Sequence, residues 1–263
     1  MRLCVEQVSF GYNKKQTVLQ NISFQAESGQ LIALLGPNGS GKTTLVKCIN
    51  RILTPREGHI TLDGVRMENF SQAEVARRIG YVPQMTKEDG AGTVLDMVLM
   101  GRRPFIKWNI REQDIQIALE ILDRIGAVEL AHREFCSLSG GQRQKILIAR
   151  AMAQEPEMFL FDEPICFLDV QNQLSIMEMA RDMVQQKNKL AIMVVHDLNL
   201  ALRYSDRILL LQNGNVVDQG VSTEVLNHKN IEAVYGVTVK MIKEETGNYL
   251  IPLEAVPKKK TLD

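Results

Sequence analysis

The chain has 263 residues, of which 31 are lysine or arginine and 31 are aspartate or glutamate, so its formal net charge is zero. Hydrophobic residues make up 45% of the chain and charged residues 24%, a balance typical of a folded globular protein and not of a disordered one. At about 150 residues per domain, the length predicts one large domain or two closely packed ones. A neutral chain without a basic block argues against a protein that binds nucleic acid through charge alone.

The apolar runs are short, and the longest, such as LIALL at 31–35 and AIMVV at 191–195, have the length of a strand. A membrane-spanning helix needs about 20 apolar residues, so we predict none in this chain. The N-terminus also lacks the apolar centre of a signal peptide. We therefore expect a cytosolic protein whose cysteines are reduced, buried and not part of a metal cluster, namely Cys4, Cys48, Cys136 and Cys166.

The first third of the chain alternates polar and apolar residues in segments of strand length. Strands are predicted over 2–9, 17–25, 30–35 and 58–62. Asp63-Gly64 after the last of them is typical of a hairpin turn. After Gly41 the pattern changes to that of a helix, predicted from Lys42 to Ile52 and stopped by Pro55.

The middle of the chain favours helices. Apolar residues recur with helical spacing in 112–126, which predicts an amphipathic helix that ends at Gly126. A second helix is predicted over 140–153, with Pro156 beyond its end. No buried strand is expected between about 87 and 155.

The last third alternates apolar runs with helical stretches. The runs are 158–161, 190–195 and 207–211, and the helical stretches are 170–187 and 198–204. Runs that are apolar on both faces and alternate with helices indicate buried strands of a mainly parallel sheet. The segment 237–253 predicts a hairpin around Gly247-Asn248. We expect a single α/β domain, with a core formed by 1–86 and 157–263 and a helical insertion over 87–156.

Residues 36–44, GPNGSGKTT, match the phosphate-loop pattern G-x-x-x-x-G-K-[ST] between a predicted strand and a predicted helix. Glycines let backbone N–H groups approach phosphates closely, and the helix that follows points its positive end at the same anion. Lys42 would reach the β- and γ-phosphates, and the hydroxyl of Thr43 would bind Mg²⁺. The nucleotide-binding residues predicted here are Gly36, Pro37, Asn38, Gly39, Ser40, Gly41, Lys42, Thr43 and Thr44.

The segment MFLFDEP at 158–164 ends an apolar strand in two carboxylates. The carboxyl edge of a parallel sheet is where ligands bind in open α/β folds. Asp162 is the predicted partner of Mg²⁺ through a water molecule, which leaves Glu163 to orient or deprotonate the attacking water. An Asp-Glu pair after a strand is commonplace by itself. In a chain that also has a phosphate loop, it indicates a metal-binding and catalytic role.

The segment LSGGQ at 138–142 could be a helix start that Ser139 caps. Placed between the phosphate loop and MFLFDEP, it resembles the signature of ABC-transporter ATPase subunits. Tyr12, Gln84, Leu168-Asp169 and His196 match, in order, the family's adenine-stacking aromatic, its Q-loop, the end of its D-loop and its switch histidine. Alone, Tyr12 would be a half-buried aromatic at a strand end and His196 a structural residue.

This resemblance implies a P-loop NTPase (ABC ATPase) fold with an N-terminal antiparallel β subdomain and a helical insertion subdomain. It further implies a head-to-tail homodimer that holds two ATP molecules, each between 36–44 of one subunit and 139–142 of the other. The implied catalytic residues are Glu163, His196, Lys42 and Gln84. The implied magnesium ligands are Thr43, Gln84 and Asp162. The further implied nucleotide contacts are Tyr12, Ser139, Gly140, Gly141, Gln142 and Asp169.

One stretch departs from the family pattern. Between the proline of MFLFDEP and Leu168-Asp169, the family usually has small or polar residues, often Thr-Ser, whereas this chain has Ile165-Cys166-Phe167. Cys166 is small but donates a hydrogen bond only weakly. The departure therefore affects the contact that this loop would make across the dimer, whereas Asp169 is retained.

Three segments look like the ATPases of iron-siderophore, haem and cobalamin importers: TVLDMVLMGRRPF at 93–105, HDLNLALRYSDRILLL at 196–211 and AVYGV at 233–237. As bare chemistry, Arg102, Arg103 and Pro104 are only a charged loop. The resemblance implies two multi-span permease subunits as partners, an extracytoplasmic solute-binding protein as an indirect partner, and a peripheral position on the cytoplasmic face of the inner membrane.

Three alternatives remain open. One is a soluble ABC ATPase that acts on nucleic acid or the ribosome, which the neutral charge and the missing coiled-coil heptads disfavour. Another is a nucleotide-sensing module without turnover, which the presence of Glu163 disfavours. The third is an importer of another solute, such as a free metal ion.

Overall fold

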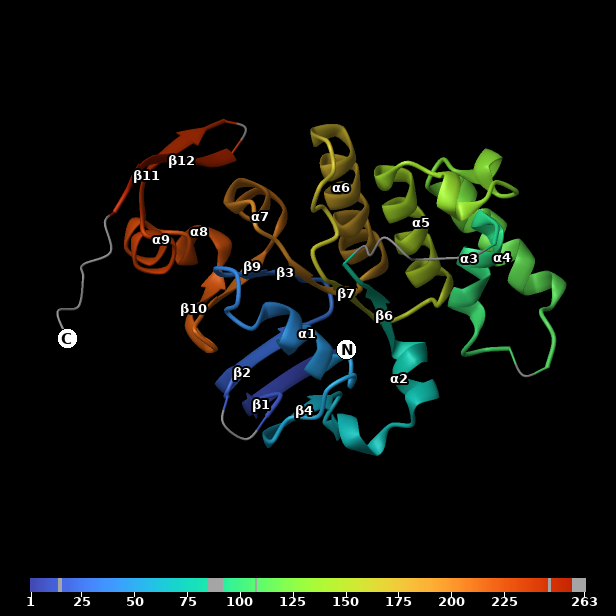
Figure 1. Ribbon diagram of the computed structural model, residues 1–263, viewed down its shortest axis with the longest axis horizontal. Helices are drawn as coiled ribbons and strands as arrows, with labels where there is room; N and C mark the ends of the chain where they lie inside the picture. Colours follow the sequence, from blue (N-terminus) through green and yellow to red (C-terminus); the bar gives the residue numbers. More distant parts are fainter. Residues whose placement is uncertain (14–15, 85–91, 107, 246, 257–263) are drawn as a thin grey trace.

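A six-stranded sheet runs through the middle of the computed structural model, in the order β10-β9-β3-β8-β7-β6 (Figure 1). Its strands are β3 (Leu31–Leu35), β6 (Ile79–Val82), β7 (Met158–Phe161), β8 (Leu190–Val194), β9 (Arg207–Gln212) and β10 (Asn215–Val221). All neighbouring pairs are parallel except β9 and β10. The structure describes residues 1–13, 16–84, 92–106, 108–245 and 247–256. Within this part, no helix combines the length and the apolarity that a bilayer span requires.

A smaller antiparallel sheet, in the order β2-β1-β4-β5, forms the N-terminal layer. Its strands are β1 (Arg2–Phe10), β2 (Leu19–Glu27), β4 (Glu57–Leu62) and β5 (Val65–Arg66). Asp63 and Gly64 join β4 to β5 with φ of 52° and 78°, the turn that their dipeptide predicts. Helix α1 (Lys42–Ile49) buries its apolar side chains in one core with residues of both sheets.

Helix α1 is shorter than its sequence indicates. The prediction extended it to Ile52, but the helix ends at Ile49 and Arg51 takes the left-handed φ of 55°. The amides of Ile52 and Leu53 both bond to the carbonyl of Lys47, so the chain turns before Pro55 is reached. The prediction was wrong because a left-handed arginine leaves no signal in the sequence.

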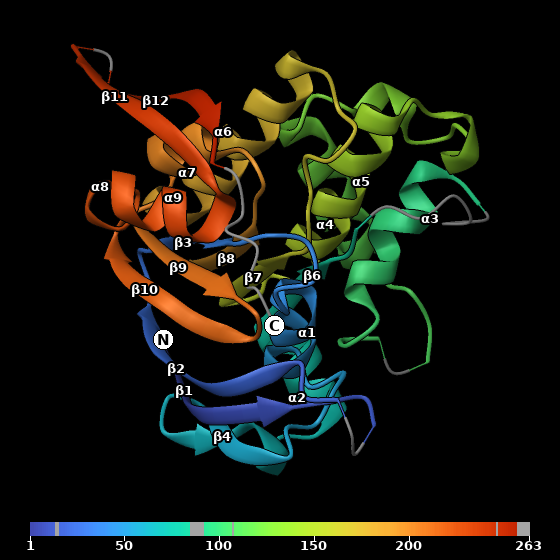
Figure 2. The ribbon, with the colours of Figure 1, turned by 60° about the vertical axis from the view of Figure 1, so that its left-hand side comes forward.

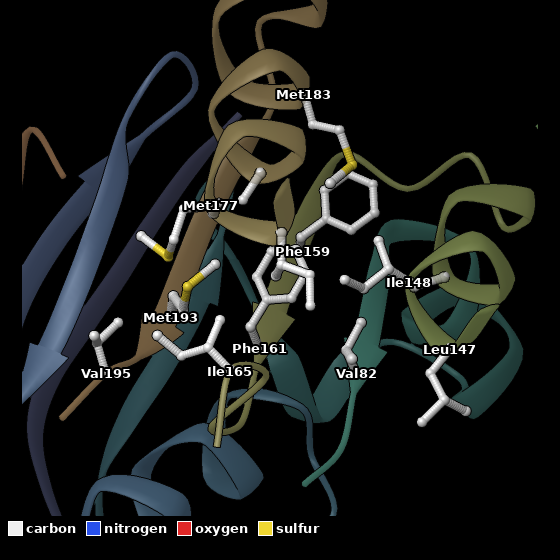
Figure 3. Packing of buried hydrophobic residues seen from close by; sticks show 14 of the residues in the cluster. Val82, Leu147, Ile148, Phe159, Phe161, Ile165, Met177, Met183, Met193 and Val195 are labelled. Carbon is white, nitrogen blue, oxygen red and sulfur yellow. The ribbon is translucent and has the colours of Figure 1, made fainter. Parts of the chain in front are cut away.

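Helices cover the other face of the large sheet. These are α5 (Gly140–Ala153), α6 (Val170–Lys187) and α7 (Leu198–Tyr204), all with the bounds that the sequence predicts. Figure 3 shows Met183 of α6 beside the ring of Phe159, within a cluster that also contains Ile148 of α5. Phe159 and Phe161 stack with ring centroids 5.9 Å apart. This apolar layer fixes β7, and so fixes where its two terminal carboxylates lie.

The helical insertion includes α5 and packs its other helices against it, on the side of the molecule opposite the C-terminal elements (Figure 2). It contains α3 (Val94–Leu99) and α4 (Glu112–Arg124). The sequence predicted α4 to Gly126, which instead has φ of 67° in the turn after the helix. Short 3-10 turns connect these and earlier elements, namely η1 (Met67–Asn69), η2 (Met100–Arg102), η3 (Val128–Leu130) and η4 (Phe135–Ser137). The predicted boundary at 86/87 falls outside the described residues.

The sequence did not predict strand β10 or three helices that complete the fold, namely α2 (Gln72–Arg78), α8 (Ser222–Val225) and α9 (His228–Tyr235). The predicted C-terminal hairpin is present as β11 (Val237–Glu244) and β12 (Gly247–Ala255), and it packs on α7. The cysteines differ from the expectation of buried thiols. Cys48 is buried, Cys4 and Cys166 are half-buried, and Cys136 is exposed because the turn η4 buries its neighbour Phe135 instead.

Arg102 holds the insertion together and is more than part of a charged loop. It is 6% exposed, and its guanidinium donates to Asp114 at 3.0 Å and to the backbone carbonyl of Ala153 at 2.8 Å. The same guanidinium lies 4.4 Å from the centre of the Phe105 ring. These contacts join η2 to α4 and to the end of α5.

We expect Arg102→Met to lower the free energy of unfolding by about 3–5 kcal/mol, because it removes the guanidinium that pairs with the buried Asp114 carboxylate. Urea unfolding followed by circular dichroism measures the change. Arg103→Met is the matched control, because Arg103 is adjacent and exposed. Equal unfolding midpoints for the two variants would contradict a stabilising role for the buried pair.

Candidate nucleotide-binding site

The loop between β3 and α1 is built by glycines that no other residue could replace without strain. Gly36 has φ of 145°, and a Cβ there would lie 2.1 Å from the carbonyl oxygen of Leu211. Gly41 has φ of 101°, and its Cβ would lie 2.6 Å from the side chain of Leu19. The backbone therefore curls tightly in front of the N-terminus of α1, the arrangement that binds phosphate groups.

Lys42 lies inside this loop. It is 5% exposed, and its Nζ donates to the carbonyl oxygens of Gly36 at 2.8 Å and Pro37 at 3.0 Å. Burial lowers the pKa of Lys42, while the carboxylates of Glu163 and Asp162 act in the opposite direction. The ammonium group is thus buried at the centre of the loop with little contact to water. A bound anion would stabilise its positive charge.

Asp162 and Thr43 form a pair of oxygen ligands beside the loop. The hydroxyl of Thr43 donates to Oδ1 of Asp162 at 2.8 Å, and the hydroxyl of Tyr81 donates to Oδ2 at 3.3 Å. Burial raises the pKa of Asp162, although these two hydrogen bonds oppose the shift. Hydroxyl and carboxylate oxygens are the donors that Mg²⁺ prefers, so the residues present fit that ion. The sequence reasoning missed Tyr81, whose position on β6 beside β7 only the sheet pairing reveals.

Glu163 is the centre of a second network. Its Oε1 accepts from Nε2 of His196 at 2.9 Å, and its Oε2 accepts from Nε2 of Gln84 at 2.9 Å. The thiol of Cys166 also donates to Oε2, at 3.2 Å. Burial acts to raise the pKa of Glu163, but the hydrogen bonds from His196 and Cys166 lower it on balance. Three predicted residues, Gln84, Glu163 and His196, are therefore brought together, with an ionised carboxylate between them.

Lys42, Thr43 and the network around Glu163 line one open cavity of about 560 Å³. Its lining combines the glycine loop with the ends of three strands, through Asn38, Gly39, Gly41, Lys42, Thr43, Thr44, Gln84, Glu163, Cys166, Phe167 and His196 together with Val18. Phe167 is fully exposed at its edge with φ of 61°. A somewhat larger groove, about 620 Å³, lies elsewhere, between the end of α1, α2 and η2.

Other predicted residues are outside this cavity. The segment 139–142 does not line it in the described structure, and Ser139 caps α5 by accepting from the amide of Gln142 at 3.3 Å. Asp169 likewise caps α6, accepting from the amide of Asn172 at 2.8 Å. Tyr12 is 61% exposed at the end of β1, so it is not a half-buried aromatic, and its hydroxyl lies 3.3 Å from that of Thr44.

A glycine loop around a buried lysine, in front of a helix and beside two carboxylates at the carboxyl edge of a parallel sheet, defines a P-loop nucleotide-binding domain. The family model described as ABC transporter matches residues 19–166. The chain belongs to this family and is an ATPase, which confirms the fold class and the enzyme class that the sequence predicts.

Two relatives and one solved structure resemble nearly the whole chain. An uncharacterized ABC transporter ATP-binding protein of Methanocaldococcus jannaschii is 45% identical, over 90% of this chain and 92% of that protein. The ferric enterobactin transport ATP-binding protein FepC of Escherichia coli is 36% identical, over 92% of this chain and 90% of that protein. A structure described as a metal-chelate type ABC transporter in an inward-facing conformation superposes with a TM-score of 0.84 at 33% identity, covering 96% of this chain and 97% of that one.

Proposed function

We propose that this chain is the ATP-hydrolysing subunit of an importer for metal chelates of the iron-siderophore, haem or cobalamin type. The observation that carries the hydrolytic part is the convergence of Lys42, Glu163 and His196 on one cavity, where Thr43 also bonds to Asp162. The likeness to FepC and to the metal-chelate transporter structure, each over nearly the whole chain, supports the import part.

In the proposed mechanism, the amides of 36–41 and the ammonium of Lys42 hold the β- and γ-phosphates of ATP. Thr43, Asp162 and Gln84 would hold Mg²⁺, whose charge stabilises the phosphate oxygens when it is bound. Glu163 accepts a proton from the attacking water, because its carboxylate is ionised and lies at the edge of the cavity. His196 orients Glu163 and donates toward the γ-phosphate.

Tyr12 would stack on the adenine ring, since its ring is exposed beside the loop that binds the phosphates. We expect Tyr12→Ala to weaken nucleotide affinity by about 1–3 kcal/mol, the usual value of one base stacked on an aromatic ring. Titration with a fluorescent ATP analogue measures this change. Tyr12→Phe keeps the ring and serves as the control. Unchanged nucleotide affinity in Tyr12→Ala would show that the Tyr12 ring does not contact the adenine.

A second copy of the chain would complete the site. Ser139, Gly140, Gly141, Gln142 and Asp169 lie outside the cavity of their own chain, although the N-terminus of α5 is suited to an anion. Phe167, fully exposed at the edge of the cavity, would be covered by the partner. We therefore propose a homodimer in which ATP binds between the loop 36–44 of one subunit and 139–142 of the other. Loss of the γ-phosphate would weaken that contact.

The permease subunits would dock in the groove of about 620 Å³ between the core and the helical insertion. Its rim exposes Ile52 by 53% and Met100 by 47%, whereas Gly101 and Arg150 line its wall. An exposed apolar rim of this kind is suited to a short amphipathic segment of a partner. The chain would thus lie on the cytoplasmic face of the membrane, bound to two multi-span permeases, with a solute-binding protein on the other side.

We expect Met100→Glu to reduce co-purification with the permease at least about tenfold, because a carboxylate would be desolvated in the interface and an apolar contact would be lost. The ATPase rate of the isolated subunit should be unchanged. Val128→Glu is the control, because Val128 is an exposed apolar residue of the same insertion outside the groove. Equal recovery of permease with both variants would place the docking surface elsewhere.

The import proposal is tested by reconstituting the chain in lipid vesicles with the membrane permease that co-purifies with it. ATP-dependent uptake of a ferric siderophore, haem or cobalamin supports the import proposal. The uptake of each chelate is compared with the uptake of the free metal ion. Uptake of the free ion alone would make this an importer of another class. Purification with ribosomes or nucleic acid in place of a permease would favour the soluble alternative.

A further inference from the structure

Three side chains of the types that bind transition metals meet at the edge of the cavity. They are Glu163, Cys166 and His196, and one potential ligand atom from each lies within 4.8 Å of the others. Nε2 of His196 lies 2.9 Å from Oε1 of Glu163, and the sulfur of Cys166 lies 3.2 Å from the other carboxylate oxygen, Oε2. A sulfur, a nitrogen and an oxygen therefore already face one another.

The spacing suits a tetrahedral ion. Zinc lies about 2.3 Å from sulfur and about 2.0–2.2 Å from nitrogen or oxygen, which places its ligand atoms about 3.2–3.6 Å apart. Small rotations of the side chains would bring the three atoms from their present positions to this spacing. The three residues line both the cavity of about 560 Å³ and a neighbouring one of about 120 Å³, so an ion could reach them from solvent and keep a fourth position open.

The chemistry of this set differs from that of the proposed magnesium site. Mg²⁺ is held by oxygen atoms alone, whereas a thiolate with an imidazole selects softer ions such as Zn²⁺ or Co²⁺. Cys166 supplies the sulfur, and it stands in the stretch where this chain departs from the Thr-Ser pattern of its family. A serine at this position would leave only two strong ligands.

We propose that a thiophilic divalent cation, with Zn²⁺ as the best fit, binds to Glu163, Cys166 and His196 in the nucleotide-free subunit and inhibits ATP hydrolysis. On binding, the thiol gives its proton to solvent and no electron is transferred. The metal-binding part stands on the geometry alone, and the inhibitory part rests on the proposed role of Glu163. In an importer of metal chelates, ATP hydrolysis would then be inhibited when the concentration of free metal ion inside the cell is high.

Binding is tested with Co²⁺ as a spectroscopic probe on the full-length protein. A thiolate-to-cobalt absorption band is expected in the parent protein and in Cys136→Ser, whose thiol is exposed and remote, and not in Cys166→Ser. The parent protein loaded with Zn²⁺ should also show one sulfur neighbour at about 2.3 Å in X-ray absorption. No band in the parent, an equal band in Cys166→Ser, or a zinc ion without a sulfur neighbour would each overturn the site.

Inhibition is tested as the Zn²⁺ concentration that halves the ATPase rate, with each variant normalised to its own metal-free rate. We expect this concentration to rise at least about tenfold in Cys166→Ser, since even the loss of a group that orients a ligand costs about 10–100-fold in metal affinity. Equal inhibition of the parent and Cys166→Ser would show that metal binding at this site does not inhibit hydrolysis. Should Glu163→Gln hydrolyse ATP normally, the proposed catalytic role would fail while the cobalt band would still report on the metal site.

Discussion

Glu163→Gln is expected to slow steady-state phosphate release by about 10²–10⁴-fold, the usual contribution of a positioned general base. The amide keeps the shape of the side chain but cannot take a proton from water. The carboxylate is held by His196 and Gln84 at 2.9 Å each, so the replacement alters the centre of a network and leaves the phosphate loop intact. Nucleotide affinity should therefore stay close to that of the parent protein.

A slow variant that still binds ATP should also accumulate as a dimer, which light scattering after size-exclusion chromatography detects. Glu157→Gln is the matched control, because Glu157 lies just before the opposite end of β7 and its side chain is 44% exposed. Hydrolysis at the parental rate would rule out Glu163 as the base. If Glu163→Gln stayed monomeric with ATP, both as the free subunit and when bound to the permease, the proposed dimer would be ruled out.

The sequence predicted those elements whose ends are set by local chemistry. Helices α5, α6 and α7 begin after Ser139, Asp169 and Asp197, and each of these side chains accepts from a backbone amide of its own first turn. A serine or aspartate that caps the start of a helix can be recognised from the sequence alone. The end of α1 is not, because it depends on the left-handed backbone of Arg51.

The elements that the sequence missed are at the edge of the structure. Strand β10 alternates half-buried and exposed residues and pairs only with β9, so its apolar signal is weak. Helix α9 has eight residues, too few for a clear helical periodicity. Both elements are fixed by packing against β9 and β11 and not by their own pattern.

The residues of the candidate site also fall into those that the sequence predicts and those that depend on the tertiary structure. The phosphate loop and the two carboxylates are contiguous motifs, and they could be read directly. Tyr81 could not, because its bond to Asp162 depends on β6 pairing beside β7. The thiol of Cys166 was noted as a departure from the family, but its position 3.2 Å from Oε2 of Glu163 depends on the left-handed turn that Glu163 itself adopts, with φ of 54°.

Lys42→Ala is expected to weaken ATP binding at least about 100-fold. Hydrogen bonds to charged groups contribute about 1.5–3 kcal/mol each, and two such bonds to the β- and γ-phosphates would be lost. In the structure the ammonium group is already inside the loop, where it donates to the carbonyl oxygens of Gly36 and Pro37. Calorimetric titration with a non-hydrolysable ATP analogue and Mg²⁺ measures the loss.

Removal of this lysine should leave the fold intact, because it relieves the protein of a buried cation whose pKa burial lowers. Lys189→Ala is the control for charge, since Lys189 precedes β8 and lines a different cavity. A parental melting temperature together with lost binding would assign the effect to the phosphates. Near-parental affinity in Lys42→Ala would mean that Lys42 does not hold the phosphates of ATP, and the phosphate-loop assignment on which the roles proposed for Thr43, Asp162 and Glu163 depend would fail.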